Sequence, residues 1–291
     1  MSCTKIGPCA VAAFITVLAM SAARPAATNV AVLTSARAPA SATVPTSSAG
    51  PMNAAASGIP GYITAAVADP ARPPSEFARD ADRKPAEVLA FTGVKPGDRV
   101  ADFMSGGGYF TRLFSRIVGG TGHVYAFVPD EEIKNCAPAE TEGTRAVGRD
   151  SAYANVSVLI APVARFRAPE ALDLVWTSLN FHDLYDSFMG PANVPAVARS
   201  MFNALKPGGA LVIVDHVAEP GSQLRDTETL HRIDPDVIIA TLEAAGFTLE
   251  GQSELLRNVA DDHRRRVFDP AIRGRTDQVI LKFRRPALPL R

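Results

Sequence analysis

Hydrophobic residues along the chain form short runs, and stretches with helical spacing lie between them. The spacing of Val194, Val197 and Met201 places these side chains on one face of a helix over about residues 191–205. Short apolar runs that alternate with helical patterns are typical of a parallel sheet covered by helices. The last two runs follow each other closely and predict an antiparallel pair at one edge. The predicted strands are 100–103, 123–128, 156–160, 173–179, 210–215, 247–256 and 278–283.

The N-terminal part of the chain has a different composition. Residues 1–23 combine a positive start at Lys5, an uncharged apolar stretch and small residues at 21–23, which predicts a cleaved signal peptide. An uncleaved membrane anchor and a misassigned start codon are the alternatives. Residues 24–74 are rich in Ala, Pro, Ser and Thr and predict a disordered linker. We therefore expect a folded domain at 75–291 in a periplasmic or secreted protein, or in a cytoplasmic one if the start codon is wrong.

The charge of the chain narrows the choice of partners. It contains 30 basic and 30 acidic residues, so its formal net charge is zero. A neutral chain without a basic face gives no reason to expect nucleic acid as a partner. Stable membrane insertion is expected only if the N-terminal segment stays uncleaved, and the composition does not predict an oligomeric state.

The stretch from Arg99 to Thr111 carries the strongest chemical signal. A short apolar strand is followed at once by three glycines and then by a helix whose apolar side includes Phe110, Leu113 and Ile117. Glycines in such a turn allow a tight bend and a close approach of the backbone to a ligand. The helix start behind them offers free N–H groups, as in nucleotide-binding α/β folds. The contiguous glycines do not match the G-x-G-x-x-G pattern of dinucleotide sites.

Four segments together resemble the class I S-adenosylmethionine (SAM) methyltransferases over residues 85–284. In chain order they read VADFMSGGG, GHVYAFVP, LDLVWTSLNFHD and LKPGGALVIVDH. The C-terminal stretch DDHRRRVFDPAIRGRTDQVILKF is similar to an exported subgroup of predicted methyltransferases. The resemblance implies an α/β, Rossmann-like class I methyltransferase fold with a seven-stranded, mostly parallel sheet, an antiparallel last strand and helices on both faces. It also implies SAM as cofactor and methyl transfer to an unidentified small-molecule substrate.

The resemblance assigns cofactor-binding roles to the glycine turn. Asp102 matches the acidic residue near the methionine end of the cofactor, and Met104 stands where the first glycine of the family motif is usual. The positions beneath the cofactor are Ser105, Gly106, Gly107 and Gly108. The departure at Met104 favours an alternative function, a catalytically inactive methyltransferase-fold protein that binds a nucleoside-type ligand.

The ribose contact is the second departure from the family pattern. Val128 occupies the place of the acidic residue that usually binds both ribose hydroxyls, so it also favours the binding-protein alternative. A nearby carboxylate can replace it by accepting two hydroxyl protons. We predict that Asp130 takes this role, with Glu131 as the next candidate. The alternative is that 129–131 only starts a helix.

The end of the fourth predicted strand supplies the catalytic candidates. Asn180 is predicted to orient the methionine amino group or a substrate, and His182 to act as a general base together with Asp183. The alternative is that His182 caps or packs the next helix. A metal site from His182, His216 and Asp215 can be drawn, but nothing in the spacing requires it, so the sequence predicts no metal. Two stretches are rich in charged residues. We interpret 79–84 as a solvated helix face, with a lid over the cofactor site as the alternative. We interpret 261–266 as a solvated loop, with an anion clamp for the substrate as the alternative.

Overall fold

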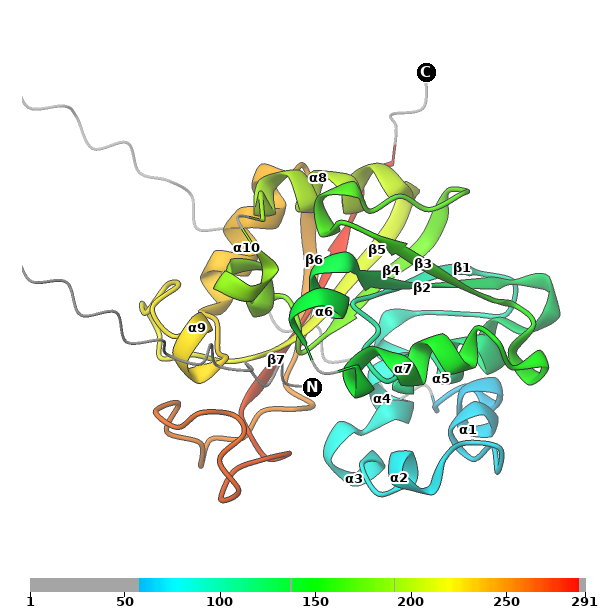
Figure 1. The fold of residues 1–291 in the computed structure, drawn as a ribbon, viewed down its shortest axis with the longest axis horizontal. Helices are drawn as coiled ribbons and strands as arrows, with labels where there is room; N and C mark the ends of the chain where they lie inside the picture. Colours follow the sequence, from blue (N-terminus) through cyan, green and yellow to red (C-terminus); the bar gives the residue numbers. More distant parts are fainter. Residues whose placement is uncertain (1–57, 137, 191, 288–291) are drawn as a thin grey trace, which may run out of the picture. The chain divides into compact units, whose positions relative to one another are not determined.

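A computed structural model describes residues 58–136, 138–190 and 192–287. Its centre is a seven-stranded sheet in the order β3-β2-β1-β4-β5-β7-β6 (Figure 1). Strands β1 to β5 pair in parallel, and β7 is antiparallel to both of its neighbours. The predicted fold class is therefore confirmed, including the antiparallel last strand. The strands are β1 (Arg99–Phe103), β2 (His123–Pro129), β3 (Val156–Ala161), β4 (Leu172–Ser178), β5 (Leu205–His216), β6 (Thr248–Ser253) and β7 (Gln278–Arg284).

Alternating side chains of the central strands feed two hydrophobic cores, one on each face of the sheet. In β1, Phe103 packs on one face and stacks on Phe127 with ring centroids 5.1 Å apart. On the other face, Trp176 of β4 lies 4.5 Å from the ring of Phe110. Because both faces are buried, helices must cover both. The α-helices of the described residues are α1 (Gly61–Val67), α2 (Pro74–Phe77), α3 (Asp80–Arg83), α4 (Pro85–Thr92), α5 (Tyr109–Val118), α6 (Asp130–Asn135), α7 (Ala139–Val147), α8 (Val194–Ala204), α9 (Thr227–Leu230) and α10 (Pro235–Ala244).

The folded part begins earlier than the sequence predicts. Helix α1 lies in the segment that we expected to be linker, and its Ile63 and Ala66 are buried in the same core as α5. The prediction of a disordered linker is therefore wrong for residues 58–74. The sequence pattern of α1 is weak because only two of its side chains are buried. The predicted signal peptide and the rest of the predicted linker lie outside the described residues. None of the helices in the described ranges is both long and apolar enough to cross a membrane.

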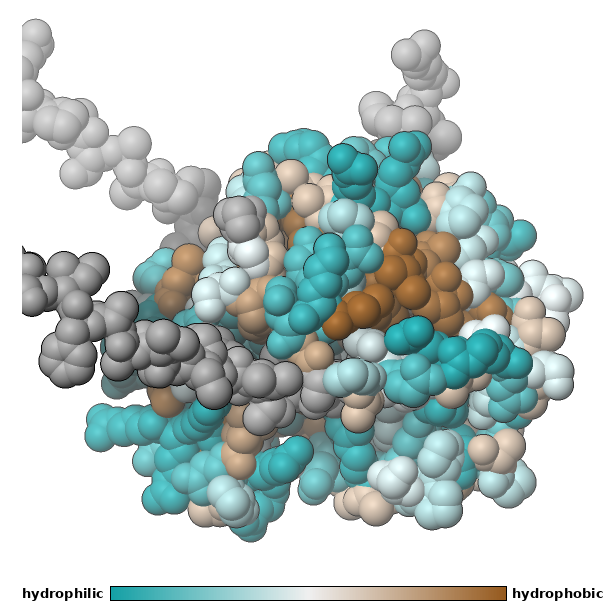
Figure 2. All heavy atoms as spheres, in the orientation of Figure 1, coloured by the Kyte–Doolittle hydropathy of each residue, from teal (hydrophilic) through white to brown (hydrophobic). Residues whose placement is uncertain are grey.

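Strand β3 forms one edge of the sheet and carries exposed apolar side chains. Ile160 is 49% exposed, and hydrophobic surface gathers over β3 in Figure 2. The edge strand lies two strands away from β1, where the chain turns through its glycines. The apolar surface is thus separate from the pocket described next.

Candidate functional site

A pocket opens at the carboxyl ends of β1 and β4, which is where ligands bind in open α/β sheets. Its empty space is about 360 Å³, part of it open to solvent. Of the predicted cofactor-binding residues, the structure brings Asp102, Ser105, Gly106, Gly107 and Asn180 together in its walls, while Gly108 sits just behind as the residue before α5. The remaining lining residues are Arg79, Arg83, Met104, Tyr109, Phe110 and Ser178.

The turn after β1 repeats one backbone conformation at every second residue. The φ angles of Met104, Gly106 and Gly108 are +56°, +53° and +82°. These left-handed values cost little for glycine and about 1–2 kcal/mol for other residues. Met104 therefore adopts the conformation of the glycine that it replaces. Its carbonyl oxygen accepts a 2.6 Å hydrogen bond from the Asn180 side chain, which ties the turn to the end of β4.

Neighbouring segments hold this turn in place. The N–H of Ser105 donates to the Phe127 carbonyl at 3.1 Å, and the Thr144 hydroxyl donates to the Gly106 carbonyl at 2.7 Å. Helix α7 approaches so closely that a Cβ on Gly143 would lie 2.4 Å from the Gly107 oxygen. The turn is thus preorganised by packing as well as by hydrogen bonds.

Asp102 is the buried acid of the pocket. It is 3% exposed, and its carboxylate accepts a 2.6 Å hydrogen bond from the Thr111 hydroxyl. Burial raises the pKa of Asp102 to about 7, although the Thr111 hydrogen bonds and the charge of Arg83 act in the opposite direction. Without a ligand, the carboxyl group is therefore close to half protonated at neutral pH. That Asp102 is ionised next to the ammonium group of a bound cofactor stays a prediction.

Helix α3 is fastened over the start of α5 by a buried polar network. The Asp80 carboxylate accepts two hydrogen bonds from Arg72, at 2.7 and 2.9 Å, and a third from the Tyr109 hydroxyl at 2.5 Å. Arg72 is 2% exposed, so the ion pair is held in one geometry. This network fixes the residues next to Asp80 against the mouth of the pocket.

Two arginines beside this network face the pocket. The Arg83 guanidinium lies 4.8 Å from the centre of the Tyr109 ring and that of Arg79 lies 5.5 Å from it. Burial and the nearby charge of Arg79 lower the pKa of Arg83 to about 10, so it stays charged at neutral pH. Within the described ranges, neither arginine forms an ion pair with a carboxylate. Arg79 and Arg83 are half-buried and line the pocket, so the interpretation of 79–84 as solvated helix surface does not hold for these two residues.

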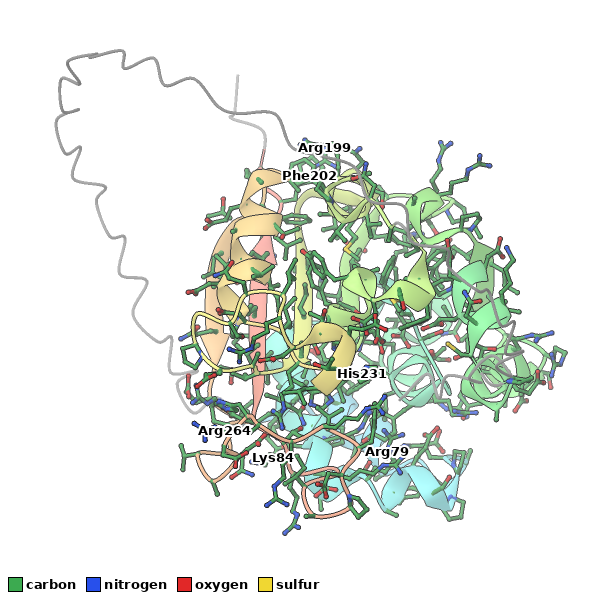
Figure 3. The ribbon with its side chains drawn as sticks, turned by 60° about the vertical axis from the view of Figure 1, so that its left-hand side comes forward. Arg79, Lys84, Arg199, Phe202, His231 and Arg264 are labelled. Carbon is green, nitrogen blue, oxygen red and sulfur yellow. The ribbon has the colours of Figure 1, made fainter. Side chains whose placement is uncertain are left out.

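The segment between β6 and β7, which contains the charged stretch 261–266, lies against these N-terminal helices. The Lys84 ammonium donates to the Leu255 carbonyl at 2.7 Å, and Figure 3 shows Arg79, Lys84 and Arg264 on the same side of the molecule. Within the predicted charged loop, Asp261 is buried and paired with Arg232, with N–O distances of 2.9 and 3.0 Å. Asp261 is therefore a buried structural residue and not part of a solvated surface.

The predicted ribose contacts lie outside the pocket lining. The Val128 side chain is fully buried, and Asp130 begins α6, where its carboxylate lies 4.0 Å from the Lys134 ammonium. The Glu131 carboxylate accepts a 3.0 Å hydrogen bond from the Val163 N–H and already has a structural partner. The ribose role of Asp130 stays a prediction.

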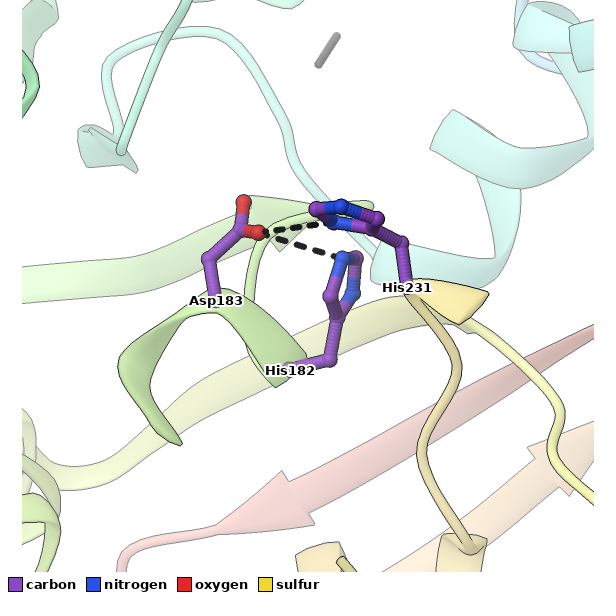
Figure 4. A group of neighbouring side chains, drawn as sticks. All are labelled: His182, Asp183 and His231. Atoms are coloured by element: carbon purple, nitrogen blue, oxygen red, sulfur yellow. Dashed lines mark ion pairs between the residues drawn. The ribbon is translucent and has the colours of Figure 1, made fainter. Parts of the chain in front are cut away.

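A buried cluster of histidines and carboxylates follows Asn180 in the chain. His182 begins the 3₁₀ helix η4 (His182–Tyr185), and its Nδ1 lies 2.7 Å from Asp215 Oδ1. On the other side of the ring, Nε2 lies 3.2 Å from Asp183 Oδ1, and His231 Nδ1 lies 3.5 Å from the same oxygen (Figure 4). Asp186 Oδ2 is 3.7 Å from His231 Nδ1. Three chain segments thus converge beside the pocket.

The charge state of His182 bears on its predicted role. Burial alone would lower the pKa of His182, but the Asp215 and Asp183 carboxylates outweigh it and raise the pKa well above its usual value. The raised pKa favours the protonated imidazolium, which cannot accept a proton, and this argues against the predicted general base. Burial would likewise raise the pKa of Asp183, but His182 and His231 hold it below its usual value.

His216 takes no part in the metal set drawn from the sequence. Its Nδ1 lies 2.7 Å from the Thr276 hydroxyl, and burial together with the charge of His182 lowers its pKa well below the usual value. Asp215 Oδ1 is hydrogen-bonded to His182 Nδ1, so neither atom is placed to bind a metal ion. The structure instead gathers His182, Asp183 and His231, with one ligand-type atom from each lying within 4.8 Å of the others.

Several residues of the site carried no signal in the sequence. Thr144 and Asp186 belong to no motif and reach the site from segments distant from the glycine turn, whereas Tyr109 directly follows the turn but has no role in the family motif.

Comparison with known proteins yields relatives among methyltransferases, whereas no protein-family model matches the chain. The ubiquinone/menaquinone biosynthesis C-methyltransferase UbiE of Vibrio cholerae is 29% identical over 195 residues, which are 66% of this chain and 63% of that protein. The protein of the same name from Ectopseudomonas mendocina is 30% identical over 204 residues, or 67% of this chain and 66% of that protein. The chain thus spans slightly less than two thirds of the length of these curated relatives.

Solved structures share the fold at lower sequence identity. A SAM-dependent methyltransferase from Aquifex aeolicus aligns with a TM-score of 0.50 and 20% identity, covering 73% of this chain and 94% of that one. The [4+2]-cyclase SpnF aligns with a TM-score of 0.51 and 18% identity, covering 72% of this chain and 82% of that one. A cyclase on this fold means that the fold alone does not determine the reaction. The chain has the fold of the class I SAM-dependent methyltransferases and is similar in sequence to C-methyltransferases of that class.

Proposed function

We propose that the protein is a SAM-dependent methyltransferase that transfers a methyl group to a small-molecule acceptor. The observation that carries the proposal is the turn after β1, where three left-handed backbone positions stand next to a buried carboxyl group in one pocket. This arrangement permits the close backbone approach that a nucleoside-linked amino acid requires. The sequence similarity to methyltransferases supports the same function.

The polar groups of the pocket fit the amino-acid end of SAM. Its ammonium group would pair with Asp102 and ionise that carboxyl, and its carboxylate would meet the unpaired guanidinium groups of Arg79 and Arg83. Asn180, whose amide already donates to the turn, would place its oxygen toward the same end. When bound, SAM supplies a methyl group made electrophilic by the sulfonium charge.

The chain's contribution to transfer would be mainly positioning. His182 is held as a charged donor between two carboxylates, so we do not assign it proton abstraction at neutral pH. Holding an acceptor in line with the methyl group can lower the barrier by about 7–11 kcal/mol in favourable cases. His182 and Asp183 would orient a polar group of the acceptor at the carboxyl end of β4.

The acceptor is a small molecule whose identity is open. The names of the relatives refer to ubiquinone and menaquinone biosynthesis. Hydroxylated aromatic compounds are therefore the first acceptors to test. A ring carbon next to an ionised hydroxyl group is nucleophilic enough to take the methyl group from a sulfonium. S-adenosylhomocysteine is released, and the hydrogen displaced from the ring carbon leaves as a proton to the solvent at the open side of the pocket.

Binding of the reaction product tests the cofactor site directly. We expect the purified full chain to bind S-adenosylhomocysteine in isothermal titration calorimetry, and the Gly106→Val variant to bind at least tenfold more weakly. A valine at φ +53° is strained and would enter ligand space. A Gly120→Ala variant serves as the control, because its added Cβ meets nothing within 4 Å and its φ is not left-handed. Equal affinity of wild type and Gly106→Val, or no binding to the wild type, would contradict the proposal.

A binding protein without catalysis is the second candidate, and Val128 favours it. The buried valine offers no acceptor for the ribose hydroxyls. Radiolabelled SAM incubated with hydroxylated aromatics separates the two candidates. Product binding without any methylated acceptor supports the binding protein, whereas turnover excludes it.

We also propose that the chain is exported, with residues 1–23 as a signal peptide. The support is the sequence pattern alone. N-terminal sequencing of the protein recovered from its producing cells should begin after residue 23, and an intact residue 1 in the cytoplasm would contradict this.

A further inference from the structure

We infer that the cluster formed by His182, Asp183, His231 and Asp186 is a binding site for a divalent transition-metal ion. The four side chains come from η4, the residue after it and the end of α9, and none is more than 5% exposed. Two imidazoles and two carboxylates are a ligand set typical of zinc and iron(II) sites.

One ligand-type atom each of His182, Asp183 and His231 lies within 4.8 Å of the other two, which is close enough for one ion to draw them together, and Asp186 lies next to His231. Atoms bound to a tetrahedral ion at about 2.0–2.2 Å lie roughly 3.3–3.6 Å from each other. Asp183 Oδ1 lies 3.2 Å from His182 Nε2 and 3.5 Å from His231 Nδ1, and Asp186 Oδ2 lies 3.7 Å from His231 Nδ1. The two longer distances exceed the usual hydrogen-bond range of about 2.7–3.2 Å.

Asp186 supplies an independent reason to place a cation here. Its side chain is 1% exposed, and its Oδ1 has no hydrogen-bond partner among the described residues. A buried carboxylate oxygen without a partner is costly. The other oxygen, Oδ2, is the one that lies next to His231, so an ion bound by both oxygens of Asp186 would supply the missing interaction.

Asp215 stands where a supporting carboxylate is found in metal sites. It holds His182 Nδ1 at 2.7 Å, which leaves Nε2 directed toward Asp183. Ligating histidines commonly donate their other ring N–H to a carboxylate in this way, and the carboxylate orients the ring. Asp215 is fully buried and also accepts the His182 backbone N–H at 2.8 Å, so it is well placed as a positioning residue.

Binding of the ion requires the Arg266 side chain to move. Its exposed guanidinium donates to His231 Nε2 at 3.1 Å. An ion on Nδ1 places the proton of the neutral ring on Nε2, so Arg266 has to turn into solvent. Removal of this side chain therefore leaves metal binding intact or strengthens it, which distinguishes a metal site from a network held by ion pairs alone.

The proposed ligand His182 follows Asn180, a residue of the pocket wall, by two positions in the chain, so the ion would lie near the carboxyl end of β4. An oxygen of the methyl acceptor would be a fifth ligand, added to the four side chains when the acceptor binds. This role rests on the proposed function, whereas the metal site itself does not.

Titration of the untagged full chain, stripped with chelator and free of SAM, tests the site. We expect one zinc ion to bind in competition with a chromophoric indicator, and cobalt(II) to give visible absorption bands typical of tetrahedral coordination. His231→Gln and Asp186→Asn should each weaken zinc binding by at least about tenfold, and Asp215→Asn by about 10–100-fold. His263→Gln is the matched control, because this histidine pairs with Asp277 at 3.0 Å outside the cluster.

The outcomes separate the possibilities. If the wild type binds no zinc, or if His231→Gln binds it as tightly as the wild type, the metal site is wrong. If Arg266→Ala abolishes zinc binding, the assignment of His231 as a ligand is wrong. The cobalt spectrum of the wild type gives a result even where a variant fails to fold. S-adenosylhomocysteine binding, measured on the same samples, tests the proposed function separately.

Discussion

Replacement of Asp102 by asparagine removes an ionisable group from the pocket and keeps nearly the same shape. The carboxyl group is buried, and its pKa is raised from 3.8 to about 7. The asparagine carbonyl can still accept the hydrogen bond from Thr111. The variant therefore isolates the effect of the charge.

The sign follows from proton binding in the two states. Between about pH 4 and pH 7 the folded protein holds a proton on Asp102 that the unfolded chain has lost, so the free energy of unfolding falls as pH rises. The contribution is fully present below about pH 4 and is lost as pH passes through about 7. At about 1.36 kcal/mol for each pH unit, the difference of about three units amounts to about 4 kcal/mol. Asp102→Asn should lack this loss.

Urea unfolding without added cofactor, followed by the fluorescence of the single tryptophan, measures the effect. We expect the free energy of unfolding of Asp102→Asn, measured relative to that of the wild type, to rise by up to about 4 kcal/mol from about pH 4 to about pH 8. The pKa of Asp69 is lowered, chiefly by the backbone N–H of Ala71, so Asp69→Asn should leave the slope above about pH 5 unchanged.

Parallel pH profiles of wild type and Asp102→Asn would refute the reasoning. They would mean that Asp102 keeps an ordinary pKa despite its burial. A second readout is available on ligand binding, because an ammonium group placed next to Asp102 should release a proton. Calorimetry with S-adenosylhomocysteine in two buffers of different ionisation enthalpy at about pH 6 should detect release of up to one proton.

Three further substitutions probe the turn and the ribose contact. Gly106→Val should lower the free energy of unfolding by about 1–3 kcal/mol in urea titrations, because its φ is +53°, and an unchanged value would mean that this backbone relaxes. Gly143→Ala should cost about 1–3 kcal/mol and weaken S-adenosylhomocysteine binding, because its Cβ would lie 2.4 Å from the Gly107 oxygen; wild-type affinity would show that α7 can shift. Asp130→Ala should weaken adenosine binding by about 1.5–3 kcal/mol if it holds the ribose. Equal binding of adenosine and 2′-deoxyadenosine by the wild type would contradict that role.

The sheet and the glycine turn could be predicted because their determinants are local. The apolar run of β1, the glycines behind it and the helical spacing of α5 are adjacent in the chain. Strand β5 is similarly marked by its apolar residues and by the Pro-Gly-Gly before them. Such patterns reflect burial on both faces of a parallel sheet, which every sequence on this fold must satisfy.

The polar part of the site depends on contacts between distant segments, so it was predicted less well. His182 becomes a charged donor because Asp215 lies beside it, 33 positions further along the chain. Asp102 gains a raised pKa from burial that no motif records. Helix α1 escaped notice because Ile63 and Ala66 are its only buried residues.

The two departures from the family motif differ in their consequences. Met104 keeps the left-handed backbone of a glycine position at φ +56°, and its buried side chain joins the hydrophobic core. Its substitution costs about 1–2 kcal/mol of backbone strain but removes no polar contact to a ligand. Val128 does remove an acceptor, and loss of one charged hydrogen-bond partner weakens binding by about 1.5–3 kcal/mol, or roughly ten- to a hundredfold. Whether the pocket retains useful affinity for a nucleoside therefore depends on what replaces the ribose contact at the end of β2, and not on the missing glycine.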